Sequence, residues 1–304
     1  MVLALFSCKK EELELPWKLH YSSPGNTLSA ITSTSTGEIL AVGGDSWYRG
    51  ISVESSGGSK TWNEDSVCNK QLFGLTKLDE KIWTLGIDGY YFERDEDPDW
   101  TFYRLGYWDI LRDAVPVNEN KVIAVGGVAF EEGVIHHIQY GGIRQIYRFE
   151  HELRWIRRLS EDSYLVGGYG LVLKSDNGGY NWQELDIKGD FFTDAHFVNG
   201  STGYIVGYAG TVWKTRDAGK SWEKMRRQDL IAPLPGFQAI WFFDEDTGII
   251  AGENGHILMT SDGGNNWKAV KGPPRNIDWY DITGLDGTAW LSGSRGNIIE
   301  LSLP

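Results

Sequence analysis

Short apolar runs that contain glycine recur along the whole chain, among them ILAVGG, VIAVGG, YLVGG and IIAG. The corresponding glycines are Gly43, Gly86, Gly126, Gly167, Gly207, Gly252 and Gly293, so that successive runs are 40 to 45 residues apart. A repeat of about 40 residues with four strand-like stretches is typical of a β-propeller blade. Seven runs predict seven blades. A six-bladed alternative would require discarding one of these evenly spaced runs.

The repeat that spans residues 191–225 shows how one unit divides. Turn residues separate four apolar stretches: Asn-Gly before the second, Ala-Gly before the third and Asp-Ala-Gly before the fourth. We therefore expect strands at 192–198, 203–206, 211–215 and 221–225.

The last repeat lacks a fourth strand, because the sequence GNIIELSLP matches a third strand and then stops. Near the other terminus, LPWKLH at residues 15–20 carries Trp17 in phase with the tryptophans that begin fourth strands. The sequence thus predicts an all-β fold over residues 15–304. This fold is a seven-bladed β-propeller with four antiparallel strands per blade and the last blade closed by the N-terminal strand.

The turn before the fourth strand carries a recognisable motif. TRDAGKSW and TSDGGNNW resemble the Asp-box, or bacterial neuraminidase repeat, and KSDNGGYNW is a variant with Asn177 in place of the aspartate. Together with GYIVGYAGTVWKT they resemble the photosystem II stability/assembly factor family of propellers. That resemblance implies a propeller that binds an unassembled protein client, with the boxes on the face away from the functional surface.

The box residues suit a structural role. Short carboxylates bond backbone N–H groups inside a turn, glycine tolerates a positive φ, and tryptophan covers a turn with a large apolar face. The residues predicted to act in this way are Asp217, Gly219, Trp222, Asp262, Gly264, Trp267 and Trp182.

Composition excludes several classes of function. The formal charge of −13 opposes binding to nucleic acid, and no run of 18 apolar residues is present to cross a membrane as a helix. The six histidines are scattered, and the neighbours His136 and His137 should point to opposite faces of a strand. We therefore expect no metal site, no cofactor, no catalytic residues and no enzymatic activity.

Cys8 follows LALFS at the N-terminus and precedes the polar stretch KKEELE. The LFSC sequence resembles the lipobox of bacterial lipoproteins, although Phe6 departs from the small residue usual there. We expect residues 1–14 to be the remnant of a lipoprotein signal and a tether, with Cys8 lipidated. An ordinary N-terminus is the alternative.

The candidate binding surface is the face formed by the loops between blades and by those between second and third strands. Aromatic and arginine residues dominate protein-binding hot spots. Those predicted to bind a partner on this face are Trp47, Arg49, Trp108, Arg112, Arg154, Phe192, Phe237, Trp279, Tyr280 and Arg295. Tyr107, Tyr48, Tyr169, Tyr208, Asp109, Asp194, Asp281 and Glu253 are assigned to the same face.

These observations favour a monomeric, non-enzymatic protein-binding or assembly scaffold, lipid-anchored in a bacterial cell envelope on its periplasmic or outer surface. Its expected partner is an unidentified protein client, with a membrane protein among the candidates. The alternative is a glycan-binding or sialidase-like extracellular protein, although no pair of a nucleophilic tyrosine with an acidic partner can be assigned.

Overall fold

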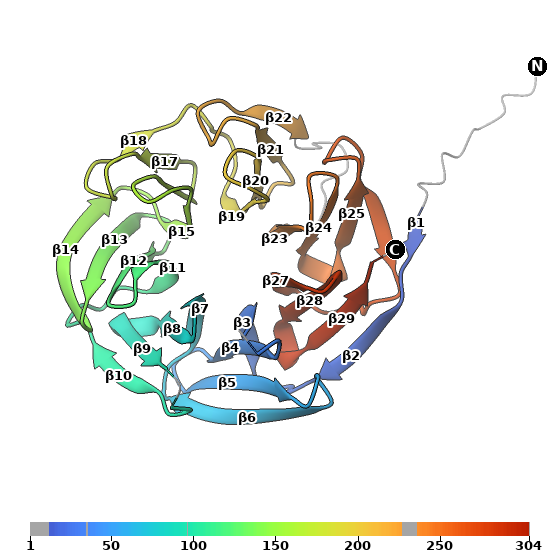
Figure 1. Cartoon of the computed structure of the whole chain (residues 1–304), viewed down its shortest axis with the longest axis horizontal. Coiled ribbons are helices and arrows are strands. Elements are labelled where there is room, and N and C mark those ends of the chain that lie inside the picture. The colour runs from blue at the N-terminus through green and yellow to red at the C-terminus, as the bar shows by residue number, and fades with distance from the viewer. Residues whose placement is uncertain (1–11, 35, 96, 227–235, 304) are drawn as a thin grey trace, which may run out of the picture.

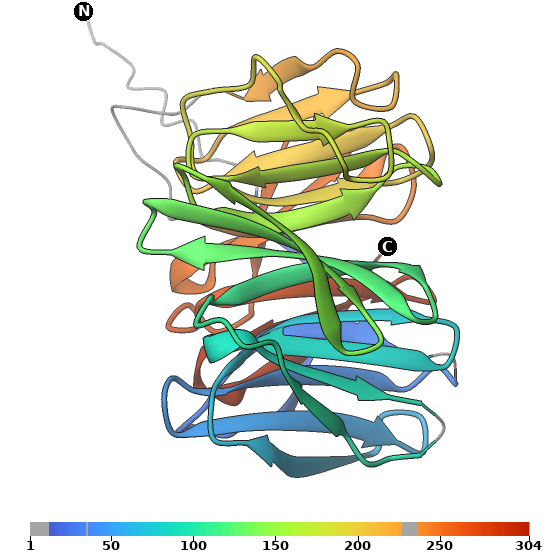
Figure 2. The ribbon, with the colours of Figure 1, turned by 90° about the vertical axis from the view of Figure 1, so that its left-hand side faces the viewer.

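Seven sheets are arranged around one axis in the computed structural model, which describes residues 12–34, 36–95, 97–226 and 236–303 (Figure 1). Each sheet is one blade, and the four strands that make up each blade are antiparallel to their neighbours, with the innermost strand facing the axis. Seen from the side, the turns lie on two opposite faces of the ring (Figure 2). The predicted seven-bladed β-propeller is confirmed.

The first four blades each consist of four consecutive strands. Blade 1 is β3 (Thr27–Ser33), β4 (Ile39–Asp45), β5 (Arg49–Ser56) and β6 (Thr61–Cys68). Blade 2 is β7 (Leu72–Leu78), β8 (Lys81–Gly86), β9 (Tyr90–Arg94) and β10 (Thr101–Arg104). Blade 3 is β11 (Leu111–Asn118), β12 (Lys121–Val128), β13 (Glu132–Gln139) and β14 (Gly142–Phe149). Blade 4 is β15 (Leu153–Arg158), β16 (Tyr164–Gly168), β17 (Val172–Ser175) and β18 (Gln183–Glu184).

The remaining blades include the two N-terminal strands. Blade 5 is β19 (Phe192–Phe197), β20 (Gly203–Gly207), β21 (Val212–Thr215) and β22 (Glu223–Arg226). Blade 6 is β23 (Phe237–Phe242), β24 (Thr247–Gly252), β25 (Ile257–Ser261) and β26 (Lys268–Lys271), with β1 (Glu12–Glu14) added outside. Blade 7 is β27 (Trp279–Leu285), β28 (Thr288–Gly293), β29 (Ile298–Ser302) and β2 (Trp17–Tyr21). Short 3-10 turns, η1 (Ile87–Gly89), η2 (Glu253–Gly255) and η3 (Ser294–Gly296), join second to third strands in blades 2, 6 and 7.

The ring is closed by β2, which pairs antiparallel with β29 in the register Trp17 to Leu301. His20 Nε2 lies 2.6 Å from a carboxylate oxygen of Glu300, which adds a side-chain contact to the same seam. The predicted closure of the last blade by the N-terminal strand is confirmed.

Strand β1 was not expected from the sequence. It pairs parallel with β26, and Glu12 forms an ion pair of 2.6 Å with Lys271. Leu13 and Leu15 pack against the apolar cluster between blades 6 and 7. Residues 12–14, which were assigned to the tether, thus form a strand, whereas residues 1–11, with Cys8, lie outside the described residues.

The core consists of apolar layers between neighbouring blades. One cluster joins Trp83 and Leu85 of blade 2 to Leu111 and Val122 of blade 3, and similar clusters join the other blades. A middle strand such as β4 is buried on both faces, which explains why these strands appear in the sequence as continuous apolar runs.

The recurrent glycine of each run is required by a close approach of two backbones. A Cβ atom on Gly43 would lie 1.9 Å from the carbonyl oxygen of Thr27, and one on Gly252 would lie 2.0 Å from that of Gly236. In both blades the second strand passes the start of the innermost strand at this point. A side chain cannot be accommodated there without moving the backbone.

The Asp-box turns connect third and fourth strands. Asp217 accepts hydrogen bonds from the backbone N–H groups of Lys220 (3.0 Å) and Ser221 (2.8 Å), and Gly219 has a φ of 75°. Bonds from Ser221, through its hydroxyl and its backbone, lower the pKa of Asp217 to about 2. The indole Nε1 of Trp222 donates to the carbonyl oxygen of Gly219 at 3.2 Å.

The box of blade 6 makes the same bonds, whereas in the variant box of blade 4 the indole Nε1 of Trp182 has no hydrogen-bond partner among the described residues. Asp262 accepts from the N–H of Asn266 at 2.8 Å, and Trp267 donates to the carbonyl oxygen of Gly264 at 3.1 Å. In the variant box, the side-chain oxygen of Asn177 accepts from the N–H of Asn181 at 2.9 Å, while Trp182 packs against the cluster between blades 3 and 4. An amide therefore replaces the carboxylate without loss of the turn.

Candidate functional site

Every innermost strand of the seven blades carries a β-bulge near its beginning. In blade 3 the register shifts between Leu111 and Asp113, in blade 4 between Leu153 and Trp155, and the other blades have the shift at the same position. A bulge inserts one extra residue and re-aims its side chain. The extra residues are Ser29, Phe73, Arg112, Arg154, Thr193, Gln238 and Tyr280.

All seven bulge residues line one cavity of about 300 Å³, together with Thr27 and Gln71. We call it the axial cavity, because every innermost strand contributes to it. The bulges lie at the beginning of these strands, on the face that carries the loops between blades. The axial cavity therefore lies on the face opposite to the Asp-box turns, as the resemblance implied for a functional surface.

Two arginines and one buried carboxylate organise one side of the axial cavity. Arg112 Nε lies 3.2 Å from Oε1 of Glu152, and Arg154 Nη1 lies 3.3 Å from the same oxygen. The side chain of Glu152 is only 3% exposed. Burial, and next the charge of Arg154, lower the pKa of Arg112 to about 10, although Glu152 opposes this change. Two guanidinium groups thus share one carboxylate, which leaves positive charge at the cavity of an acidic protein.

Aromatic rings and neutral polar groups complete the lining. The Arg112 guanidinium lies 4.3 Å from the ring centroid of Phe73 and forms a cation–π contact with it. The hydroxyls of Thr193 and Tyr280 and the amide of Gln238 lie elsewhere in the same lining. The arrangement offers charge for an anionic group, hydrogen bonds for a peptide backbone and ring faces for apolar groups.

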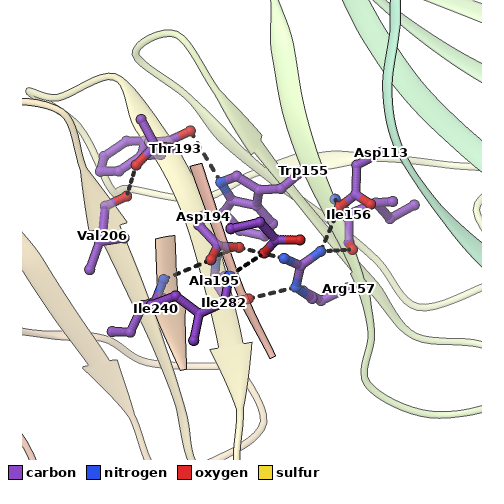
Figure 3. Close-up of polar contacts among 12 residues, drawn as sticks. Asp113, Trp155, Ile156, Arg157, Thr193, Asp194, Ala195, Val206, Ile240 and Ile282 are labelled. Atoms are coloured by element: carbon purple, nitrogen blue, oxygen red, sulfur yellow. Dashed lines mark hydrogen bonds and ion pairs between the residues drawn. The ribbon is translucent and has the colours of Figure 1, made fainter. Parts of the chain in front are cut away.

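A second polar layer lies deeper along the innermost strands. Arg157 forms ion pairs with both Asp113 and Asp194, and so connects blades 3, 4 and 5 (Figure 3). Burial opposes the charge on Arg157, but the two carboxylates outweigh it and raise its pKa.

The aspartates of this layer connect consecutive blades. Asp113 accepts from the N–H of Ile156 in blade 4 at 3.0 Å, and Asp194 accepts from the N–H of Ile240 in blade 6 at 2.8 Å. Asp281 of blade 7 does the same with Ile31 of blade 1, also at 2.8 Å. Each aspartate therefore holds the innermost strand of the following blade.

Two of these carboxylates are strongly perturbed. Burial raises the pKa of Asp194 to about 6, against the effect of Arg157. Burial, and next the charge of Asp194, raise the pKa of Asp281 to about 8. Asp194 and Asp281, which the sequence assigned to the binding face, thus bond backbone between blades instead.

The structure brings three predicted binding residues together: Arg112, Arg154 and Tyr280 all line the axial cavity. Trp47 is 53% exposed and Trp108 is 71% exposed on loops of the same face, outside the cavity lining. Arg49 and Arg295 are also exposed. None of these four residues lines the cavity, and Arg49 instead forms an ion pair with Glu64 on β6, the outermost strand of blade 1.

Three predicted binding residues do not reach the surface. Phe192, Phe237 and Trp279 are 0%, 1% and 0% exposed. Each immediately precedes a bulge residue and packs between blades, so the next residue along the chain, Thr193, Gln238 or Tyr280, lines the cavity in its place. The physical reason for this correction is the inserted residue of the bulge, which the strand alternation does not reveal.

Sequence reasoning missed Phe73, Glu152 and the bulge residues Ser29, Thr193 and Gln238. A signal for them exists, because the segments LSAI, LFGL, LRDA, LRWI, FTDA, FQAI and WYDI occupy the bulges in successive blades. In each, a large apolar residue precedes the cavity residue.

The histidine pair behaves as a structural pair in β13. His136 Nε2 lies 2.9 Å from Oδ2 of Asp109, and His137 Nε2 lies 3.1 Å from the carbonyl oxygen of Gly179. Within the described ranges, no group of three His, Cys, Asp or Glu side chains is placed to hold a metal ion. No helix in the described part of the chain is long and apolar enough to cross a membrane.

Comparison with known proteins agrees with this geometry. The family model of the photosynthesis system II assembly factor YCF48 matches residues 184–286. The matched segment runs from the end of blade 4 into blade 7 and includes two of the Asp-boxes. The predicted resemblance to this family is confirmed. No curated protein is similar enough in sequence to be matched.

Solved structures of low sequence identity share the fold. YCF48 from Cyanidioschyzon merolae is 15% identical with a TM-score of 0.71, over 94% of this chain and 98% of that one. A structure of YCF48 bound to D1 peptide is 15% identical with a TM-score of 0.73, over 97% and 98%. A catalytically inactive virginiamycin B lyase from Staphylococcus aureus is 12% identical with a TM-score of 0.73, over 95% and 100%. Because an assembly factor and a lyase share it, this fold does not itself specify a function.

Proposed function

We propose that the protein is a non-enzymatic assembly scaffold that binds a segment of a protein client in the axial cavity. The observation that carries the proposal is the convergence of all seven bulge residues on one cavity, with Arg112 and Arg154 sharing a single carboxylate. The uncompensated charge favours a client segment with a carboxylate, either a side chain or a chain terminus. The family match and the YCF48 structure with a bound peptide support the same assignment.

A membrane protein is the client that we favour, by analogy with the D1 peptide of the YCF48 structure. A cavity of about 300 Å³ can hold a few side chains but no folded domain. The client would therefore present an extended or terminal segment, as an unassembled subunit does. On this proposal the propeller recognises the segment before the subunit is incorporated.

The sialidase-like alternative meets a chemical difficulty in the axial cavity. Such an enzyme needs a tyrosine nucleophile, which is activated by a lowered pKa or a neighbouring base. Tyr280 is the tyrosine in the lining, and burial, followed by the charges of Asp278 and Glu253, raises its pKa. The lining also has two arginines where three would grip a carboxylate.

The proposal can be tested by capture with the purified propeller from the detergent-solubilised membrane fraction of its own source. Bound proteins are identified by mass spectrometry for the wild type and for a double variant, Arg112→Ala with Arg154→Ala. Arg144→Ala, an exposed arginine on β14, is the matched control. We expect one client to be retained by the wild type and the control and lost by the double variant.

Turnover of a sialoside, or capture that ignores the double substitution, would contradict the proposal. A glycan array probed with the wild type, the double variant and the control tests whether the propeller binds glycans instead of a protein client. Binding of a glycan that depends on Arg112 and Arg154 would favour the alternative function.

We further propose a bacterial envelope location with a lipid anchor on Cys8. The motif LFSC before a polar stretch supports it. Intact-mass spectrometry of the protein expressed in a bacterium with its native N-terminus should show a diacylglyceryl adduct, and Cys8→Ser should abolish it. An unmodified cysteine would contradict this part of the proposal.

A further inference from the structure

Three aromatic rings, two of them exposed and that of Phe191 half-buried, form a cluster beside the axial cavity. Phe130 lies in the β12–β13 loop, Tyr169 in the β16–β17 loop, and Phe191 immediately precedes β19. Their ring centroids are 5.3 Å (Phe130 to Tyr169), 5.5 Å (Phe130 to Phe191) and 5.7 Å (Tyr169 to Phe191) apart. We call them the aromatic triad. Phe130 is 51% exposed and Tyr169 is 45% exposed. Large apolar groups that gather on a surface usually mark a contact site.

The aromatic triad is continuous with the charged wall of the cavity. The Arg154 guanidinium, which lines the cavity, lies 5.1 Å from the ring centroid of Phe191. Arg154 therefore belongs to both surfaces, and a ligand that reaches its guanidinium also reaches the rings.

One carboxylate positions both parts. Oε1 of Glu152 holds the two arginines, while its Oε2 accepts a hydrogen bond from the backbone N–H of Phe130 at 3.1 Å. Phe130 has a φ of 66°, a left-handed conformation that is unusual for a bulky residue and needs support from its surroundings. The Glu152 bond supplies part of that support and fixes the exposed ring beside the arginines.

We propose that the aromatic triad is a second subsite, which takes an aromatic side chain of a client segment that has a carboxylate a few residues away. The inference rests on the proposed function, because it assigns the carboxylate to the arginines of the axial cavity. It adds a sequence requirement for the client: acidity alone is not sufficient, and the aromatic residue must follow or precede the acid at short range. The positive charge of the cavity and the contiguous rings together select this combination.

The experiment uses four synthetic decapeptides with a fluorescent label, measured by anisotropy. One carries a glutamate and a phenylalanine two residues apart, one has serine for the phenylalanine, one has glutamine for the glutamate, and one separates the two residues by six. The receptors are the wild type, Phe130→Gly and Tyr169→Ala. Glycine at position 130 keeps the left-handed backbone while it removes the ring. Tyr180→Ala is the control, because Tyr180 is 50% exposed but lies within the variant Asp-box turn, on the opposite face.

We expect the close-spaced peptide to bind the wild type and Tyr180→Ala about tenfold more tightly than it binds Phe130→Gly or Tyr169→Ala. The serine peptide should bind all four proteins alike and more weakly. The widely spaced peptide should behave like the serine peptide. Circular dichroism and melting temperature of each variant establish that it is folded.

Equal binding of the close-spaced peptide to all four proteins, with loss on Arg154→Ala, would overturn the aromatic subsite and leave the proposed function intact. Binding of no peptide to the wild type would overturn both. Binding of sialyllactose, used as a glycan probe, with loss in the two aromatic variants would assign the rings to a glycan instead and would also overturn the inference.

Discussion

The two faces of this ring use the same repeat in opposite ways. At the Asp-box turns the sequence is repeated, and the boxes of Asp217 and Asp262 make the same local bonds. At the bulges the backbone is repeated in all seven blades, yet the residue that it aims at the axis changes from serine to phenylalanine, arginine, threonine, glutamine and tyrosine. Positions that carry similar residues in different blades thus stabilise the fold, as in the Asp-box turns. Equivalent positions that carry different residues line the axial cavity.

The polar layer of Arg157, Asp113 and Asp194 gives the largest expected effect of a substitution on stability. Replacing Arg157 with methionine leaves the carboxylates of Asp113 and Asp194 without their cation, which typically costs about 3–5 kcal/mol of unfolding free energy. Chemical denaturation should show this loss at pH 7 and a smaller loss near pH 5, where Asp194 can take a proton. Arg144→Met is the control. If the denaturation midpoint of Arg157→Met equals that of the wild type, the layer does not depend on Arg157.

Trp222→Ala tests the Asp-box face. Its indole is half-buried against the cluster between blades 4 and 5, so the loss should be about 2 kcal/mol, roughly half of that for a fully buried tryptophan. Thermal melting measures it, and peptide binding should not change. Loss of binding at full stability would reverse the assignment of the two faces.

The pH dependence of stability should reveal Asp281, which connects blade 7 to blade 1. Its folded-state pKa of about 8 exceeds the unfolded value near 4, so protonated Asp281 favours the folded state. This contribution to the free energy of unfolding is complete below pH 4 and is lost as the pH rises towards 8. Each unit of such a shift corresponds to about 1.4 kcal/mol. The advantage of the wild type over Asp281→Asn should therefore shrink between pH 5 and pH 8 in denaturation series. A constant difference would show that Asp281 titrates normally.

Arg154→Ala should produce the complementary result to Trp222→Ala. We expect it to weaken binding of a glutamate-containing peptide by more than about 1 kcal/mol, since it removes half of the positive charge of the cavity wall. Its melting temperature should remain close to that of the wild type, because Glu152 keeps Arg112 as a partner. Calorimetric titration and melting measured on the same sample would separate the two effects.

The smallest expected effect on peptide binding belongs to Glu152→Gln. Removal of the negative charge should tighten binding of the serine decapeptide by about 0.5–1 kcal/mol at low salt, and the gain should decrease as salt is added. The phenylalanine peptide should gain less, because the amide cannot accept both from the arginines and from the N–H of Phe130. Weaker binding of both peptides would show that the carboxylate itself contacts the ligand.

The sequence was informative where a physical requirement recurs. Each close approach of two backbones requires a glycine, so the number of blades could be predicted from Gly43 and its equivalents. The closing strand could be predicted because Trp17 has the same spacing as the tryptophans that begin fourth strands. The sequence was less informative where one residue is inserted, because the bulge moves the cavity position from Phe192 to Thr193 and from Trp279 to Tyr280. Strand β1 was missed because Glu-Leu-Glu has no strand signal of its own and depends on contacts with blades 6 and 7.

The seam between β2 and β29 has a consequence for how the chain is made. His20 and Glu300 lie 2.6 Å apart but are separated by 280 positions in the sequence, so β2 leaves the ribosome long before its partner β29 exists. Until then β2 lacks the strand with which it pairs, and its backbone N–H and C=O groups are available to other chains. Contacts of such long sequence separation also slow the search for the native state. Ring closure should accordingly be the late step of folding, and nascent chains that stop before β29 should be the species that require a chaperone.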